Sequence, residues 1–399
     1  MRLVVRLVLA AAALAGAMLV IAQPPTPVAP RVVNLTSHRH VTVDQIAFSP
    51  DGRIAAVSGT RDLGGAFDPI ITLWAVDRGQ LLYTLRGNDA GWGRFDFSPD
   101  GKVLALADRD RVVLREAGSG AVIRRLKHPG VTTVQFSPAG KHLLSTSARE
   151  VGDQVRSDIR VWDYAAGRRL FSPAWEKGEW DQWAEFAADG RLRFLTNRLR
   201  LRTWDPATGA ERPPVRLAGD PEGYIARSRN GTALLTSKGG QLQLYDTTTG
   251  EVRRAFGAPR DEVPFPQFTP DGRVVLGSLG DGRVEVWDAE TGKLRTTIHT
   301  LDEKRKESLS EHPTPDGKFV VAQWGVWTVK PGAHYDQVAI YAIDGRLVRR
   351  ETTARLIKFD AAMRTAAVVT APPVPEGQTR QLHLTFHDAA AWLAGGKKE

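Results

Sequence analysis

The sequence contains no cysteine, which excludes disulfides, thiolate metal sites and cysteine nucleophiles. Beyond residue 22 it has no apolar run long enough to cross a bilayer. It also lacks the motifs typical of nucleotide binding, zinc proteases and serine hydrolases, and its nine histidines do not have the spacing of metal ligands. We therefore expect no catalytic residue, no cofactor and no metal, and we interpret the chain as a protein that is not an enzyme.

The first 22 residues have the pattern of a targeting segment. Arg2 and Arg6 precede an apolar stretch over residues 7–22, which ends in small or branched residues before Gln23. This pattern is typical of a secretory signal peptide. We expect cleavage after residue 22, a proline-rich linker over residues 23–30, and export to the periplasm or the cell exterior. The alternative is an uncleaved segment that anchors the chain in a membrane.

The composition is that of a globular chain, with 42% hydrophobic and 25% charged residues. The formal net charge is +9, but the basic residues are spread along the chain beside 45 acidic residues. A nucleic-acid-binding protein would be expected to cluster its positive charge. We therefore do not expect nucleic acid as a partner.

A short motif recurs along the rest of the chain. Residues 48–52 read Phe-Ser-Pro-Asp-Gly, and five closely related and two eroded copies follow. Proline presets φ, aspartate bonds nearby backbone and glycine tolerates positive φ, so the motif predicts a tight turn. The copies end at residues 52, 101, 140, 190, 231, 272, 317 and 363.

A second signal alternates with this turn. It is a strand-like run that usually ends in an aromatic residue, as in residues 71–74 and 284–287. Together with apolar runs on both sides of the turn and after the aromatic residue, it predicts four short antiparallel strands, a to d, per repeat. Four strands in about 44 residues are typical of one blade of a β-propeller.

These motifs resemble the WD40 repeat family. Trp-Asp pairs stand at residues 162–163, 204–205 and 287–288. The resemblance implies an all-β, closed propeller over residues 31–390, followed by a C-terminal tail over residues 391–399. Eight units predict eight blades, with residues 32–36 completing the last blade beside residues 381–387; seven blades are the alternative. We expect helix content close to nil after residue 23, because no apolar period of 3.6 residues occurs there.

The resemblance also assigns structural roles to repeat residues. The blade-core tryptophans are Trp74, Trp162, Trp204 and Trp287. In the family, an aspartate six residues before this position joins a buried hydrogen-bond network with a Gly-His pair. The aspartates at that spacing are Asp68, Asp108 and Asp281, whereas His128 is the nearest match to the histidine, one residue out of register.

The other tryptophans point to a partner-binding face. In an a-b-c-d blade, the b–c and d–a connections share one face, which we call the loop face, and the a–b and c–d turns share the opposite turn face. We expect long connections on the loop face over residues 58–69, 147–158, 299–314, 323–336 and 371–381. Six tryptophans fall in or beside loop-face connections and are candidates for partner binding, unless they only cover their own loops. They are Trp92, Trp175, Trp180, Trp183, Trp324 and Trp327.

We interpret the chain as a monomeric protein-interaction scaffold with a protein partner whose identity the sequence does not reveal. One alternative is a propeller that binds or hydrolyses a small molecule or sugar, and another is a polyanion binder. Arginines along the fourth repeat form either an anion-binding patch or packed stems with solvated heads. These arginines are Arg191, Arg193, Arg198, Arg200 and Arg202.

Overall fold

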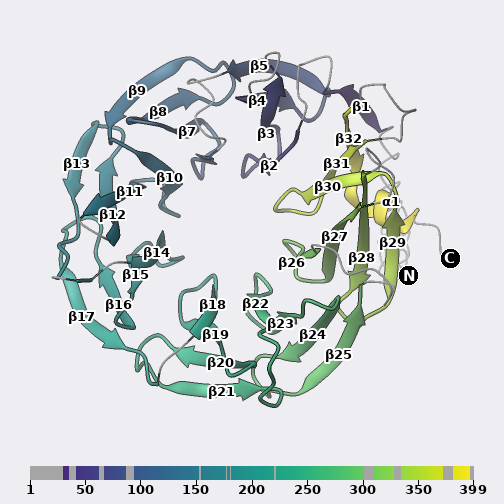
Figure 1. The fold of residues 1–399 in the computed structure, drawn as a ribbon. Coiled ribbons are helices and arrows are strands. Elements are labelled where there is room, and N and C mark those ends of the chain that lie inside the picture. Colours follow the sequence, from purple (N-terminus) through teal and green to yellow (C-terminus); the bar gives the residue numbers. More distant parts are fainter. Residues whose placement is uncertain are drawn as a thin grey trace, which may run out of the picture.

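The structure is a computed structural model that describes residues 30–35, 42–62, 67–86, 94–151, 154–176, 178–179, 181–219, 222–300, 309–327, 334–371 and 381–395. It consists of eight four-stranded antiparallel sheets arranged as blades around a central axis (Figure 1). The predicted all-β, eight-bladed propeller is confirmed, and the seven-blade alternative is wrong. The predicted signal peptide and most of the predicted linker lie outside the described residues.

Strand a of each blade lies nearest the centre and strand d lies at the rim (Figure 1). Blade one contains β2 (Gln45–Phe48), β3 (Ile54–Asp62), β4 (Phe67–Ala75) and β5 (Gln80–Arg86). Blade two contains β6 (Phe95–Phe97), β7 (Val103–Asp108), β8 (Arg111–Glu116) and β9 (Val122–Lys127). Blade three contains β10 (Val131–Phe136), β11 (Leu143–Val151), β12 (Gln154–Asp163) and β13 (Arg168–Phe171). Blade four contains β14 (Asp181–Phe186), β15 (Leu192–Thr196), β16 (Arg200–Trp204) and β17 (Glu211–Arg216).

The second half of the ring repeats this order. Blade five contains β18 (Glu222–Arg227), β19 (Ala233–Lys238), β20 (Gln241–Asp246) and β21 (Val252–Phe256). Blade six contains β22 (Phe265–Phe268), β23 (Val274–Ser278), β24 (Arg283–Asp288) and β25 (Leu294–His299). Blade seven contains β26 (Leu309–Pro313), β27 (Phe319–Trp327), β28 (His334–Ala342) and β29 (Leu347–Glu351). Blade eight contains β30 (Ala354–Phe359), β31 (Thr365–Thr370), β32 (His383–Asp388) and, as its strand d, β1 (Arg31–Asn34).

The recurring motif forms the a–b turn by a fixed set of hydrogen bonds. In blade one the Ser49 hydroxyl donates to Asp51 Oδ1 (2.6 Å) and accepts from the Ile54 N–H (2.9 Å). Gly52 has φ +72°, where a side chain would be strained. The hydroxyl-to-aspartate bond recurs in three other blades, at Ser98–Asp100, Thr269–Asp271 and Thr314–Asp316.

The hydrophobic core lies between successive blades. Trp74 packs with Val33 and Leu384 of blade eight, and Trp287 packs with Leu235 of blade five. A propeller blade must bury both faces of its sheet, and each tryptophan fills the space toward the preceding blade. The four blade-core tryptophans are buried, with exposed fractions of 1% for Trp74, 6% for Trp162, 3% for Trp204 and 8% for Trp287.

The ring is closed by strands from the two ends of the described chain. β1 pairs antiparallel with β32, with Arg31 opposite Phe386 and Asn34 opposite His383 (Figure 1). The Leu35 N–H extends this ladder by donating to the Leu382 carbonyl at 2.7 Å. The predicted closure of the last blade by the N-terminal strand is therefore confirmed.

A short helix follows the last strand and is the only helix among the described residues, in keeping with the expectation that helix content is close to nil after residue 23. Helix α1 (Ala389–Ala394) begins after Asp388, whose carboxylate accepts from the Ala391 N–H at 2.8 Å. Its Trp392 is buried, and Arg349 of β29 donates to the Trp392 carbonyl at 2.6 Å. An alanine-rich run with an aspartate N-cap favours a helix, and burial of Trp392 holds it against the ring. Among the described residues, no helix has the length and apolar character needed to span a membrane.

Ring closure gives a prediction with a matched control on one strand. Val33 is buried in the core between blades eight and one, whereas the neighbouring Val32 is 64% exposed. Val33→Asp should lower the free energy of unfolding by about 3 kcal/mol, because it buries an unpaired charge. Val32→Asp should change it by about 0.5 kcal/mol or less. Chemical denaturation measures both, and equal losses would contradict the proposed role of β1 in the seam.

Candidate functional site

Three connections that the sequence predicts as long loops are instead extended β-hairpins on the loop face. In blade one the β3–β4 ladder continues to the pair of Asp62 with Phe67. The β11–β12 ladder likewise ends at Val151 opposite Gln154, and the β27–β28 ladder at Trp327 opposite His334. These segments lack a clean apolar alternation because they extend beyond the blade core, where the backbone ladder and cross-strand pairs such as Arg61–Asp68 hold them.

The six candidate tryptophans have different positions. Trp175 is half-buried and packs on Phe194, with ring centroids 4.8 Å apart. Trp183 is half-buried on β14 beneath the guanidinium of Arg227, which lies 4.5 Å from the ring centroid. Both therefore cover part of their own region of the propeller. Trp324 and Trp327 belong to β27, where only their backbone is described, and Trp92 and Trp180 lie outside the described residues. A partner site formed by this set stays a prediction.

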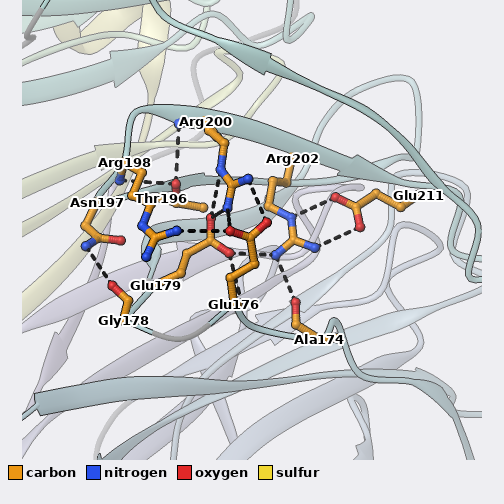
Figure 2. A network of polar contacts seen from close by, with 10 residues as sticks. All are labelled: Ala174, Glu176, Gly178, Glu179, Thr196, Asn197, Arg198, Arg200, Arg202 and Glu211. Atoms are coloured by element: carbon orange, nitrogen blue, oxygen red, sulfur yellow. Dashed lines mark hydrogen bonds and ion pairs between the residues drawn. The ribbon is translucent and has the colours of Figure 1, made fainter.

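Three arginines of the blade-four stripe, Arg198, Arg200 and Arg202, are paired with carboxylates (Figure 2). Fully buried Glu179 accepts from Arg200 at 2.5 Å and from Arg202 at 3.0 Å. Glu176 accepts from Arg200 and also from Arg198, and hydrogen bonding to Glu176 is the main cause that raises the pKa of Arg200. These three guanidiniums are therefore not free to bind an external anion.

The remaining arginines of the stripe are neutralised in the same way. Arg191 and Arg193 both pair with Asp189, at 2.9 Å and 2.5 Å. Arg202 pairs in addition with Glu211 at 2.7 Å, and its guanidinium lies 4.7 Å from the ring centroid of Trp204. The stripe is thus a network of ion pairs, with the Arg202 guanidinium over aromatic rings, and this pairing favours a structural role over an anion patch.

Polar side chains of the inner strands connect neighbouring blades around the channel. Asp96 of blade two accepts from the Phe136 N–H of blade three at 2.7 Å. Gln135 of blade three accepts from the Phe186 N–H of blade four at 2.8 Å. Burial raises the pKa of Asp96 to about 6. Both side chains occupy the position just before the first residue of the repeated turn motif, which carries a polar residue in every blade except blades one and five, where it is alanine.

The same position carries ionisable groups elsewhere in the ring. Glu185 of blade four pairs with Arg227 of blade five at 2.8 Å. His312 of blade seven lies 3.2 Å from Lys358 of blade eight, measured from Nε2 to Nζ. Burial lowers the pKa of Lys358 and lowers that of His312 to about 3, so the imidazole is neutral near pH 7 and can accept a hydrogen bond. These contacts stabilise the channel wall.

The channel contains a cavity of about 750 Å³ toward the turn face. Asp96, Gln135, Glu185 and Arg227 line it, together with phenylalanines of strands β6, β10 and β14. Its volume would admit a small ligand. Three of these four polar groups already bond a neighbouring blade, as described above, and Arg227 is the ion-pair partner of Glu185. Over the described part of the chain, no group of three or more histidine, aspartate or glutamate side chains could hold a metal ion.

Blade three contains a buried hydrogen-bond network. The Trp162 indole N–H donates to Ser145 Oγ at 2.7 Å, and His128 Nδ1 lies 2.6 Å from the same oxygen. His128 Nε2 lies 3.2 Å from Ser147 Oγ and 3.6 Å from Asp158 Oδ2. Burial lowers the pKa of His128 to about 4, so the imidazole is neutral near pH 7 and links serines of strand b to the tryptophan of strand c.

The aspartate of this network was missed because it stands four residues before Trp162, not six. The aspartates at the predicted spacing pair with arginines of their own blades instead of joining a histidine network. These pairs are Asp68–Arg61, Asp108–Arg111 and Asp281–Arg283. The sequence signal that could have found the network is the combination of His128, two serines on strand b and a complete Trp-Asp pair.

An exposed aromatic pair lies on the loop-face side of the channel. Tyr224 of β18 and Phe265 of β22 have ring centroids 4.2 Å apart and are 51% and 48% exposed. They stand near the start of their inner strands, where the d–a connections enter the blades. Large aromatic side chains with this exposure are uncommon unless a partner covers them. Sequence reasoning missed them because it followed tryptophans only.

Comparison with known proteins agrees with this architecture. The family described as "WD domain, G-beta repeat" matches residues 120–163, which include all five residues of the blade-three network. The chain is 26% identical over 293 residues to jouberin of Rattus norvegicus, covering 67% of this chain and 27% of jouberin. It is 25% identical over 276 residues to protein tipD of Dictyostelium discoideum, covering 64% of this chain and 41% of tipD. The chain thus spans less than half the length of these relatives.

Solved structures show the same fold. A crystal structure of a eukaryotic initiation factor has a TM-score of 0.54 at 18% identity and covers 78% of each chain. The computationally designed Ika8 protein has a TM-score of 0.57 at 18% identity, covering 86% of this chain and 96% of Ika8. The matched repeat and these propeller relatives support a WD40 β-propeller.

The blade-three network can be tested with two equivalent substitutions. The Trp162 indole N–H is hydrogen-bonded, whereas that of Trp287 has no partner among the described residues. Both Trp162→Phe and Trp287→Phe remove part of a buried ring, but only the first breaks a hydrogen bond. Trp162→Phe should therefore cost about 1 kcal/mol more in unfolding free energy. Equal costs in urea denaturation would show that the network contributes no net stability.

Proposed function

We propose that this WD40 β-propeller is a non-catalytic protein-interaction scaffold that binds a protein partner through its loop face. The observation that carries the proposal is the Tyr224–Phe265 pair, which exposes two aromatic rings beside the channel. Aromatic residues are enriched among the side chains that dominate binding energy at interfaces. The WD40 match and the propeller relatives fit a scaffold of this kind.

The two faces of the ring differ in a way that favours the loop face. On the turn face, the a–b connections are tight turns held by the repeated hydroxyl-to-aspartate bonds. On the loop face, blades one, three and seven carry extended hairpins, which break the symmetry of the ring. Variable segments on a rigid scaffold supply specificity without disturbing the core. We place the partner on this asymmetric face.

The alternative of a ligand-binding or hydrolytic propeller has weaker support. The channel cavity contains two carboxylates, but Glu185 is paired with Arg227 and Asp96 accepts from a backbone N–H. Hydrolysis would require a nucleophile or general base within reach of a substrate. The polyanion alternative is weakened by the paired arginine stripe of blade four, which was its main candidate site.

We further propose that the scaffold works outside the cytoplasm, because residues 1–22 have the pattern of a signal peptide. N-terminal sequencing of the protein from its producing cell should give a mature chain that begins near Gln23. An intact Met1 in the membrane fraction would instead favour the anchored alternative.

The partner site can be tested by site-specific photocrosslinking in the producing cell. A photoreactive phenylalanine at position 265 should crosslink to a discrete partner. The control is position 123 on outer strand β9, where Ile123 is 52% exposed, and it should give no such product. The double substitution Tyr224→Ala with Phe265→Ala should weaken binding of the captured partner at least tenfold, because each anchor contributes roughly 1–2 kcal/mol. Its melting temperature should stay within a few degrees of wild type.

The opposite pattern would exclude this face. Equal crosslinking from positions 265 and 123, or full binding by the double variant, would place the partner elsewhere on the propeller. Loss of binding together with a collapse of thermal stability would assign the two rings a packing role.

A further inference from the structure

Two buried polar side chains meet between blades six and seven. Glu311 on β26 and Ser278 at the end of β23 are each 7% exposed. The Ser278 hydroxyl lies close enough to Glu311 to lower its pKa, but within the described residues neither Glu311 Oε1 nor Ser278 Oγ makes a hydrogen bond of good geometry. An unsatisfied buried polar group carries a free-energy cost that a native protein rarely retains without a reason. A group supplied from outside the chain would remove this cost.

These atoms adjoin the exposed aromatic pair. Phe265 stands directly opposite Ser278 in the β22–β23 ladder, so their side chains share one face of the sheet. Gln267, two residues further along β22 on the same face, donates to the Glu311 carbonyl at 2.5 Å. That face of β22 therefore points toward β26 and Glu311. The Tyr224 and Phe265 rings are in contact, Phe265 stands opposite Ser278 in the ladder, and Ser278 lies close to the Glu311 carboxyl.

The electrostatics of the series favour a cation. Burial raises the pKa of Glu311 to about 7, against smaller opposing effects of the Ser278 hydroxyl and its own backbone. No described arginine, lysine or histidine forms an ion pair with Glu311 or affects its pKa. No described cation therefore neutralises the Glu311 carboxylate, whereas Glu285 of blade six is paired with Arg260. The faces of Tyr224 and Phe265 carry partial negative charge and also attract cations.

We propose that Tyr224, Phe265, Ser278 and Glu311 form a receptor for a cationic side chain, the ammonium of lysine or the guanidinium of arginine, on the partner protein. The aromatic rings contact the stem of that side chain, and Ser278 Oγ and Glu311 Oε1 accept hydrogen bonds from its head group. The proposal rests on the proposed function, because the cation is part of the polypeptide that docks on the loop face.

The direct test measures the ionisation of Glu311 with small-molecule probes. The protein is labelled with ¹³C-glutamate, and the Glu311 carboxyl resonance is identified as the one missing in Glu311→Gln. n-Butylammonium at ten times its Kd should lower the measured pKa by about one unit, because it binds the ionised carboxylate. N-Butylguanidinium compares arginine with lysine chemistry, and uncharged 1-pentanol should leave the pKa unchanged.

Variants of the receptor supply the second measurement. Phe265→Ala should weaken n-butylammonium binding severalfold, and Ser278→Ala should do the same without removing the carboxyl. Ile123→Ala, on the opposite side of the ring surface, is the matched control and should bind like wild type. A pKa of Glu311 that neither cation shifts would overturn the proposal, since a bound water would then satisfy the two oxygens.

The chain also has its own basic run, Lys304-Arg305-Lys306, seven to five residues before Glu311 in the sequence. If replacing these three residues by alanine raises the pKa of Glu311 and creates probe binding that wild type lacks, the chain supplies its own cation and the proposal fails. Crosslinking from position 265 separates the two proposals. If position 265 still crosslinks to a partner but neither cation shifts the pKa of Glu311, the proposed scaffold function stands and the cation receptor is disproved. If a cation shifts the pKa but position 265 gives no crosslink, the receptor stands and the loop face is disproved as the partner-binding face.

Discussion

The structure depends on the closure of the ring between its last and first blades. Every blade is covered on both faces only if the sheets form an uninterrupted circle, and β1 completes this circle by pairing with β32. Two further contacts cross the junction: Arg31 donates to the Val76 carbonyl at 3.0 Å, and Arg364 donates to the Asp51 carbonyl at 2.6 Å. Closure also removes the open edge that β32 would otherwise present.

Within the closed ring, apolar and polar contacts between blades have separate roles. Tryptophans such as Trp74 and Trp204 fill the space between sheets, whereas side chains such as Asp96 and Gln135 connect inner strands across the channel. The apolar contacts supply most of the burial energy. The polar contacts satisfy backbone N–H groups at the inner edge, where no further strand exists to pair with them. Both kinds of contact together hold neighbouring blades in place.

The basic composition of the chain does not translate into a basic surface patch on blade four. The five arginines of its stripe, from Arg191 to Arg202, are each within 3.0 Å of a carboxylate oxygen, from Asp189, Glu176, Glu179 or Glu211. By contrast, Glu311 is buried without a described cation. The paired arginines of blade four therefore have a structural role, whereas Glu311, which has no described cation beside it, is the group that we assign to partner recognition.

The sequence by itself determined the repeat and the register of the core, and it favoured eight blades over seven. The turn motif and the aromatic end of strand c are local signals, because a tight turn and an alternating strand depend on residues within a few positions of each other. It also contained the signal for α1, an aspartate followed by alanines, which the search for an apolar period overlooked. Local chemistry was sufficient for these features.

Only the tertiary structure decided which residues from distant segments of the chain come into contact. Asp158 lies close to His128 although it stands four residues before Trp162, not six. The ion pair of Arg200 with Glu179 connects strand β16 to the d–a connection that precedes blade four. The extended hairpins arise from backbone pairing that needs no apolar pattern. Phe265 adjoins Tyr224 and Ser278 because neighbouring blades and strands are brought into register by the closed ring. Such contacts depend on distances across the fold, which residue order along the chain does not specify.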